Sequence, residues 1–113
     1  MDYRKDDAYY VQKITNDLQF ICEHMKDVTM SLFEENPVLQ DSMMFRLVQV
    51  PENAQKLTDC FRNAHPSIPW RDVYGLRNRI VHDYGAVDLQ IVYTTLNSDV
   101  PFLLKELTGR TYS

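Results

Sequence analysis

The chain has 113 residues, of which 44% are hydrophobic and 25% are charged, and only three are glycines. This composition excludes a disordered segment, and the length fits one domain spanning residues 1–113. The scarcity of glycine disfavours glycine-rich phosphate loops and tight β-turns, and therefore favours helices. The net charge of −4 argues against a protein that coats nucleic acid with a basic surface.

The two cysteines, Cys22 and Cys60, have neither CxxC nor zinc-ligand spacing, and each lies among apolar residues of a helical pattern. We therefore predict two buried free thiols. No segment approaches the roughly 18 apolar residues of a membrane span. The charged N-terminus also lacks the apolar stretch of a signal peptide. These features predict a cytoplasmic protein with no membrane partner.

Two long helices are expected in the first half of the chain. Residues 6–34 carry apolar side chains at alternating steps of three and four, namely Val11, Ile14, Leu18, Ile21, Met25, Val28 and Leu32. Asp17 belongs to the solvated face between them. Asn36-Pro37 begins a second helix over residues 37–64, because asparagine caps a helix and proline is tolerated at its first position. Pro51 lies inside it with the apolar pattern still in phase, so we expect a kink rather than a break.

Two further helices are expected after the turn that follows. One covers residues 69–83, and the other covers residues 89–108, with Asp88 as its cap and Gly109 at its end. Pro101 is expected to bend or restart the last helix. Because the connections are short, the prediction is an all-α fold, an up-and-down antiparallel four-helix bundle with a kinked second helix.

Arg77 is the residue that a simple core pattern does not explain. At about 100° per residue, it falls in the middle of the apolar stripe that Trp70, Val73 and Val81 define on the third helix. A buried guanidinium there needs an ion pair or a cleft. Glu52, beside the expected kink of the second helix, is the obvious partner.

Asn78 and His82 lie on a neighbouring edge of the third helix, four residues apart, so the amide can orient the imidazole. The last helical turn favours a protonated ring. A bland interpretation stays open, in which Arg77 extends its charge to solvent and His82 only caps the helix. The other histidines have no metal-ligand spacing with His82, and no Walker loop, HExxH or dinucleotide fingerprint is present.

The sequence Arg77-x4-His82-x-Tyr84 resembles the Rx4HxY signature of HEPN-domain ribonuclease toxins, specifically the HepT branch of MNT–HepT toxin–antitoxin systems. The resemblance covers about residues 8–107. It is carried further by the runs IPWRDVYGLRN at 68–78 and VDLQIVY at 87–93, by Val100-Pro101, and by Glu52, Ala54 and Leu57. The motif alone is weak, whereas these segments in register are specific.

This chain departs from the family pattern in its second helix. Pro51 stands where the family usually has glycine, and Asn53 where it often has alanine. Phe45 stands where the family has an arginine directly before Arg46. These departures concern the local shape of the second helix and one cation of the cleft, and they leave the motif intact.

The resemblance implies a metal-independent ribonuclease without a cofactor, acting on tRNA or mRNA. His82 would be the general acid and base, because imidazole titrates near neutral pH. Arg77 would stabilise the charge that develops on the phosphorane oxygens. Asn78 would orient His82 or bind phosphate, Glu52 would hold Arg77, and Arg79 would add local positive charge.

The resemblance also implies partners. A homodimer would supply two histidines to one cleft, since a single one cannot easily be both base and acid, and a larger heteromeric complex is compatible with it. Tyr84 would be the residue to which an MNT-type nucleotidyltransferase antitoxin adds AMP, placing phosphate charge beside the cleft. The alternative for Tyr84 is an aromatic plug under the helix end.

Two other functions stay open at this point. The first is a catalytically inactive HEPN helical dimer that serves as a binding partner of a nucleotidyltransferase. The second is a purely structural bundle. Because Arg77, Asn78, His82 and Tyr84 are all present, the ribonuclease is the preferred interpretation.

Overall fold

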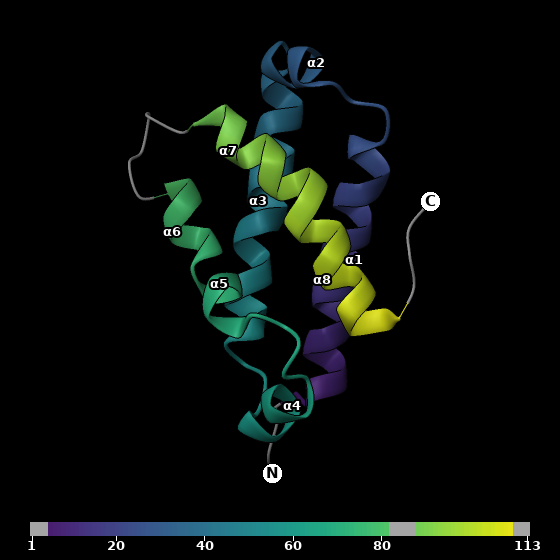
Figure 1. The fold of residues 1–113 in the computed structure, drawn as a ribbon, viewed down its shortest axis with the longest axis vertical. Helices are drawn as coiled ribbons and strands as arrows, with labels where there is room; N and C mark the ends of the chain where they lie inside the picture. The colour runs from purple at the N-terminus through teal and green to yellow at the C-terminus, as the bar shows by residue number, and fades with distance from the viewer. Residues whose placement is uncertain (1–4, 82–87, 110–113) are drawn as a thin grey trace.

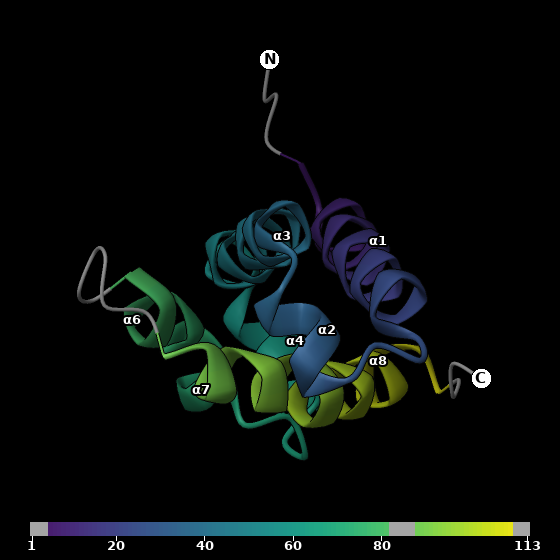
Figure 2. The same cartoon turned by 90° about the horizontal axis from the view of Figure 1, so that it is seen from above.

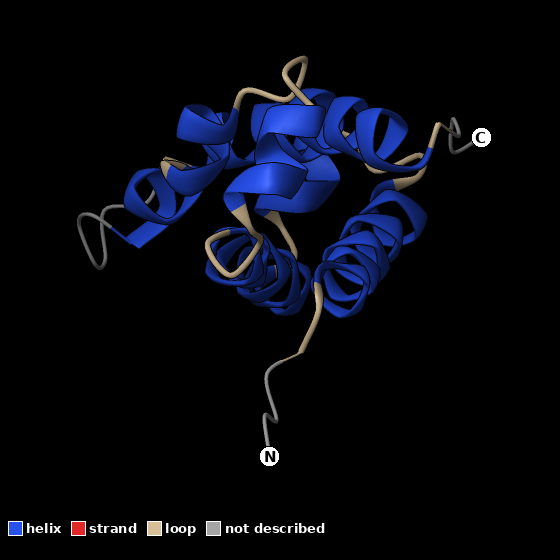
Figure 3. Cartoon of the chain, turned by 90° about the horizontal axis from the view of Figure 1, so that it is seen from below, coloured by secondary structure: helices blue, strands red, loops and turns tan. Residues whose placement is uncertain are grey.

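The computed structural model describes residues 5–81 and 88–109 of the chain. Every regular element among these residues is helical (Figure 3). The elements are α1 (Asp7–Met25), α2 (Met30–Glu34), α3 (Pro37–Ala54), α4 (Asp59–Ala64), α5 (Trp70–Tyr74), α6 (Leu76–Val81), α7 (Leu89–Thr94), the π-helical turn η1 (Thr95–Asp99) and α8 (Val100–Thr108). None of the helices in the described part is long and apolar enough to cross a membrane.

The helices form an up-and-down bundle, which confirms the predicted fold class. In Figure 1, α1 and α3 run in opposite directions, α5 and α6 return along α3, and α7, η1 and α8 descend across the front. Seen along the bundle, α1 and α3 lie side by side on one side and the row from α7 to α8 covers them on the other (Figure 2). The short helices α2 and α4 close its two ends (Figure 1).

The first predicted helix is two helices, and its continuity to residue 34 was wrong. α1 ends at Met25, and Asp27 adopts a left-handed backbone conformation with φ of 60°. Thr29 then caps α2 by accepting a hydrogen bond from the Leu32 N–H at 3.1 Å. Since a threonine hydroxyl can satisfy the free N–H groups of a helix start, it competes with continuation of α1. Leu32 consequently leaves the predicted seam and is 53% exposed.

The second predicted helix is also divided, although the division does not fall at Pro51. α3 passes through Pro51 and ends at Ala54. Thr58 then caps α4, accepting from the Phe61 N–H at 3.1 Å. Thr58 also donates its own N–H and hydroxyl to the Asp7 carboxylate at 2.9 and 2.6 Å. This contact from α1 fixes a new helix start where the apolar pattern alone predicted continuity.

The third and fourth predicted helices follow their expected course with local changes. Gly75, in a helical conformation, separates α5 from α6. Asp88 caps α7 as predicted, and Gly109, with φ of 70°, ends α8 as predicted. The predicted restart of the last helix before Pro101 is present: α7 passes into the π-helical turn η1, and α8 begins at Val100, directly after Asp99, with Pro101 in its first turn. A proline ring clashes with the preceding turn of an α-helix and has no N–H to donate, and a wider turn relieves both problems.

The core agrees closely with the predicted apolar faces. From α1 it takes Ile14, Leu18, Ile21 and Met25, and it adds Phe33, Met43, Leu47, Val50, Ala54, Leu57, Ile68, Val73, Leu76, Val92, Leu96, Val100, Leu103 and Leu104. Each of these side chains is almost fully removed from water. A set of this size, shared by all four predicted segments, explains why the short helices stay in place.

Two side chains lie where the sequence did not place them. Asp17, assigned to the solvated face, is only 6% exposed, because Arg46 of α3 reaches across and donates to it. Cys60, predicted to be buried, is exposed on α4. Cys22 is half-buried, and burial raises the pKa of its thiol. Both cysteines are free, as predicted.

Candidate active site

The described part of the predicted site centres on Arg77 in α6. Its Nη1 atom lies 3.2 Å from Oε1 of Glu52, in the last turn of α3, so the predicted ion pair is present. The guanidinium also extends toward solvent, as the alternative interpretation allowed, since 61% of the Arg77 side chain and 43% of the Glu52 side chain are exposed. An ion pair this open to water is weak. The guanidinium therefore has a partner in Glu52 and is still open to an incoming anion.

Two of the other predicted site residues belong to the same helix as Arg77. Asn78 follows it in α6 and is exposed. Arg79 also belongs to α6. His82 and Tyr84 lie outside the described residues. The structure therefore brings Arg77 together with Glu52 and shows Asn78 on the same short helix.

A groove that the sequence analysis missed begins at Gln55, three residues after Glu52 in the chain. It is lined by Gln55 at the end of α3, Arg62 and Asn63 of α4, and Trp70 and Tyr74 of α5. Its residues come from three helices, so no single segment of the sequence predicts the groove. The one signal was the spacing of Trp70, Tyr74 and Arg77, which follow each other at helical steps of four and three.

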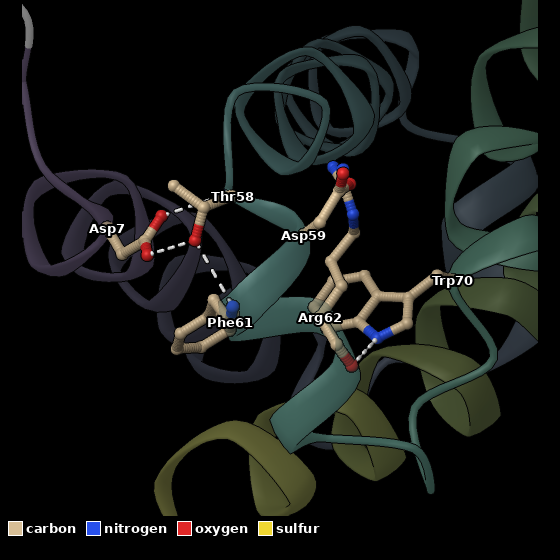
Figure 4. A network of polar contacts seen from close by, with 6 residues as sticks. All are labelled: Asp7, Thr58, Asp59, Phe61, Arg62 and Trp70. Atoms are coloured by element: carbon tan, nitrogen blue, oxygen red, sulfur yellow. Dashed lines mark hydrogen bonds and ion pairs between the residues drawn. The ribbon is translucent and has the colours of Figure 1, made fainter.

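Hydrogen bonds and an ion pair hold the walls of the groove. The Trp70 indole Nε1–H is placed 3.2 Å from the carbonyl oxygen of Arg62 (Figure 4). It lies at the same distance from the carbonyl oxygen of His65. Arg62 pairs with Asp59, and this partner raises the pKa of the guanidinium. The groove therefore carries a guanidinium paired with a carboxylate on one wall and an oriented indole on another.

No group of three or more histidine, cysteine, aspartate or glutamate side chains in residues 5–81 and 88–109 is arranged to hold a metal ion. The ion pair itself supplies a guanidinium and a carboxylate, and the amides of Gln55 and Asn78 lie near it in the chain. Guanidinium and amide groups suit the recognition of phosphate oxygens and of polar ring edges.

Comparison with known proteins assigns the family. The model of the family described as ribonuclease HepT-like matches residues 5–108. The chain belongs to the HepT-like ribonuclease family. This agrees with the resemblance that the Arg77-x4-His82-x-Tyr84 motif carries, and with the all-helical bundle.

Relatives of similar size carry ribonuclease names. The chain is 28% identical over 98 residues to "Putative RNase TTE0752" of Caldanaerobacter subterraneus subsp. tengcongensis, covering 87% of this chain and 88% of that protein. It is 26% identical to "Probable ribonuclease HepT" of Thermococcus cleftensis, covering 83% of this chain and 86% of that one. These names support a ribonuclease function for this HepT-like chain.

A third relative is a longer protein. The chain is 30% identical over 104 residues to "Gamma-glutamylcyclotransferase and putative RNase MJ0434" of Methanocaldococcus jannaschii. The match covers 92% of this chain and 47% of that protein. No solved structure matches this HepT-like chain.

Proposed function

We propose that this protein is a metal-independent endoribonuclease whose reaction is carried by Arg77 and His82, with tRNA or mRNA as substrate. The observation that supports this most directly is the position of Arg77, exposed on α6 and held by Glu52 at 3.2 Å. A guanidinium placed in this way can bind a phosphate diester and stabilise the charge of its transition state.

The proposed reaction uses the nucleophile that RNA itself supplies. The imidazole of His82 takes the proton of a ribose 2′-hydroxyl, and the resulting oxygen attacks the adjacent phosphorus. The bond to the 5′-oxygen breaks, and that oxygen leaves with a proton donated by a second imidazole. The products are a 2′,3′-cyclic phosphate and a 5′-hydroxyl. Asn78 orients His82 or binds phosphate, and Arg79 adds positive charge.

The need for two imidazoles leads to a homodimer. Each chain has one motif histidine, and two chains with facing motifs would provide both a base and an acid. The acidic net charge of −4 fits a local rather than a general attraction for RNA, with the arginines of two motifs as its source. Larger assemblies with other chains are compatible with such a dimer.

Control of this activity is assigned to Tyr84. An MNT-type nucleotidyltransferase antitoxin would transfer AMP to its hydroxyl, and the added phosphate charge would repel RNA from the neighbouring cleft. We place the pair in the cytoplasm, where RNA and ATP are both available. A tyrosine that only packs under the helix end would leave toxicity unaffected by the partner.

The decisive experiment compares matched variants on RNA in the presence of a chelator. Arg77→Ala and His82→Ala are each expected to abolish cleavage and growth inhibition. Arg71→Ala, at an exposed arginine of α5, and His24→Ala, at an exposed histidine of α1, are expected to keep both. Retained cleavage in both motif variants would refute the proposed function. A wild-type protein that binds a nucleotidyltransferase but leaves RNA intact would favour the non-catalytic dimer.

A further inference from the structure

The groove beside the ion pair offers a combination of groups that suits one kind of ligand. Trp70 uses its indole N–H on backbone carbonyls, so its contribution to the groove is ring surface. The Tyr74 hydroxyl is buried without a hydrogen bond of ordinary geometry among the described residues, so the exposed part of Tyr74 is also mainly ring. Two aromatic surfaces in one groove favour a flat, partly apolar ligand.

Polar groups at the groove add hydrogen bonding and charge. Gln55 and Asn63 are both exposed, and each amide offers donors together with an acceptor. The Arg62 guanidinium, held by Asp59, lies 6.0 Å from the centre of the Tyr74 ring. Nucleobases are bound in single-stranded RNA by this combination, in which rings or guanidinium planes stack on a base and polar side chains bind its edges.

The groove and the ion pair are neighbours on two helix faces. Tyr74 precedes Arg77 by three residues, and the intervening Gly75 is helical in conformation. Glu52 precedes Gln55 by the same spacing, and the backbone of Gln55 is also helical. Three residues along a helix rise about 4.5 Å and return to nearly the same face. The groove therefore begins about one helical turn from Glu52, the partner of the guanidinium.

We propose that this groove, formed by Gln55, Arg62, Asn63, Trp70 and Tyr74, binds a base of single-stranded RNA next to the phosphate held by Arg77. The inference rests on the proposed ribonuclease function and adds its substrate-binding subsite. The groove selects for an unpaired nucleotide, because a base in a duplex cannot offer both its face and its edge. Cleavage is thereby directed to single-stranded segments.

The chain provides its own reporter for this subsite. Trp70 is the single tryptophan of the protein, so its fluorescence reports on the groove alone. The probe is a short 2′-O-methyl oligoadenylate, which cannot be cleaved because its nucleophile is blocked. Titration into the full-length protein is expected to quench Trp70 in a saturable manner. A parallel measurement of anisotropy with a labelled copy of the same probe reports total binding.

The test variant is Gln55→Ala/Asn63→Ala, which removes both exposed amides and leaves the aromatic walls. Its affinity for the probe is expected to fall about tenfold, and its KM for cleavable oligoadenylate to rise about tenfold with kcat near the wild-type value. The matched control is Gln12→Ala/Asn16→Ala, which removes an exposed amide pair from α1 and is expected to change neither value. Circular dichroism verifies that both variants are folded.

The outcomes separate this inference from the ribonuclease itself. Normal cleavage and probe binding in the Gln55→Ala/Asn63→Ala variant would overturn the groove assignment and leave the ribonuclease standing. Binding by anisotropy without any change in Trp70 emission would also overturn it. Stronger quenching by free AMP than by the probe would assign the groove to a mononucleotide and reject RNA. Amide-dependent quenching by a wild-type protein that does not cleave RNA would support the groove and refute the ribonuclease.

Discussion

The Arg46 guanidinium of α3 donates to the Asp17 carboxylate of α1 at 2.8 Å and lies 3.9 Å from the centre of the Phe20 ring. Asp17 is 9% exposed and Arg46 is 31% exposed, measured over their side chains. An ion pair thus links α1 and α3, the two helices that pack most extensively against each other. The carboxylate is the more deeply buried partner, so it depends on the guanidinium more than the reverse.

Arg46→Ala is therefore expected to lower the free energy of unfolding by about 2 kcal/mol, because it leaves the Asp17 carboxylate without its partner. Urea denaturation followed by circular dichroism measures the loss. A double-mutant cycle with Asp17→Ala is the control, and the double variant should lose less than the sum of the single changes. Additive losses would show that the pair contributes nothing of its own.

Glu52→Gln is expected to reduce RNA cleavage by about 10- to 100-fold, because Arg77 would no longer be fixed by a charged partner. Its free energy of unfolding should change by less than about 1 kcal/mol, since the pair is largely exposed. Cleavage assays and urea denaturation on the same preparation measure the two quantities. Asp41→Asn, at an exposed carboxylate of α3, serves as the control. Wild-type cleavage in Glu52→Gln would show that Glu52 does not position Arg77.

The contact between Asp7 and Thr58 predicts a dependence of stability on pH. The Thr58 hydroxyl, and after it the Thr58 N–H, hold the pKa of Asp7 below its ordinary value of 3.8. Asp7 thus binds a proton less readily in the folded chain than in the unfolded one. The stabilisation is present above the unfolded pKa and is lost as the pH falls through the folded pKa.

Asp7→Asn should accordingly be less stable than the wild type at neutral pH, and the difference should shrink in acid, below about pH 4. Thermal unfolding at a series of pH values measures this difference. Asp41→Asn again provides the comparison, because it removes the charge of an exposed carboxylate on α3. A difference in stability between Asp7→Asn and the wild type that does not change with pH would show that the charge of Asp7 does not contribute to the contact with Thr58.

The left-handed backbone of Asp27, between α1 and α2, predicts that glycine is more stable than alanine at this position. Asp27 adopts φ of 60°, a conformation that costs a residue with a side chain about 1 kcal/mol or more and costs glycine almost nothing. Asp27→Gly is expected to be about 1 kcal/mol more stable than Asp27→Ala. Comparing the two variants by urea denaturation cancels the loss of the carboxylate. Equal stabilities would indicate that the turn relaxes when its side chain changes.

Helical periodicity predicted the architecture because each long segment buries one continuous stripe. The seam of Ile14, Leu18 and Ile21 is buried as expected. The partner of Arg77 could also be predicted, since a charge within an apolar stripe leaves few choices and Glu52 was the nearest carboxylate in the pattern.

The helix ends could not be predicted in the same way. Neither glycine nor proline directly follows Met25 or Ala54, so the sequence carries no strong signal for a helix end there. The next helices begin where the hydroxyl groups of Thr29 and Thr58 cap them. The Thr58 cap is in turn held by Asp7, a contact between distant parts of the chain. Helix propensities describe residues in their local sequence, so they cannot predict a contact between distant residues.

Asp17 and the groove share this limitation. From the sequence alone, a charged residue such as Asp17 is assigned to the solvated face. Its ion-pair partner, Arg46, belongs to another helix, so the pair is known only once the helices are packed. The groove is assembled by α3, α4 and α5 together, so only their packing brings its amides and rings to one place.

The bond between Asp7 and Thr58 joins residues 51 positions apart and closes the first half of the chain into a loop. α4, which supplies Arg62 and Asn63, begins at that closure. A chain shortened to start beyond Asp7 would keep every residue of α4 and yet lose the anchor of its first turn. The first turn of α1 is in this sense a remote support for the wall of the groove.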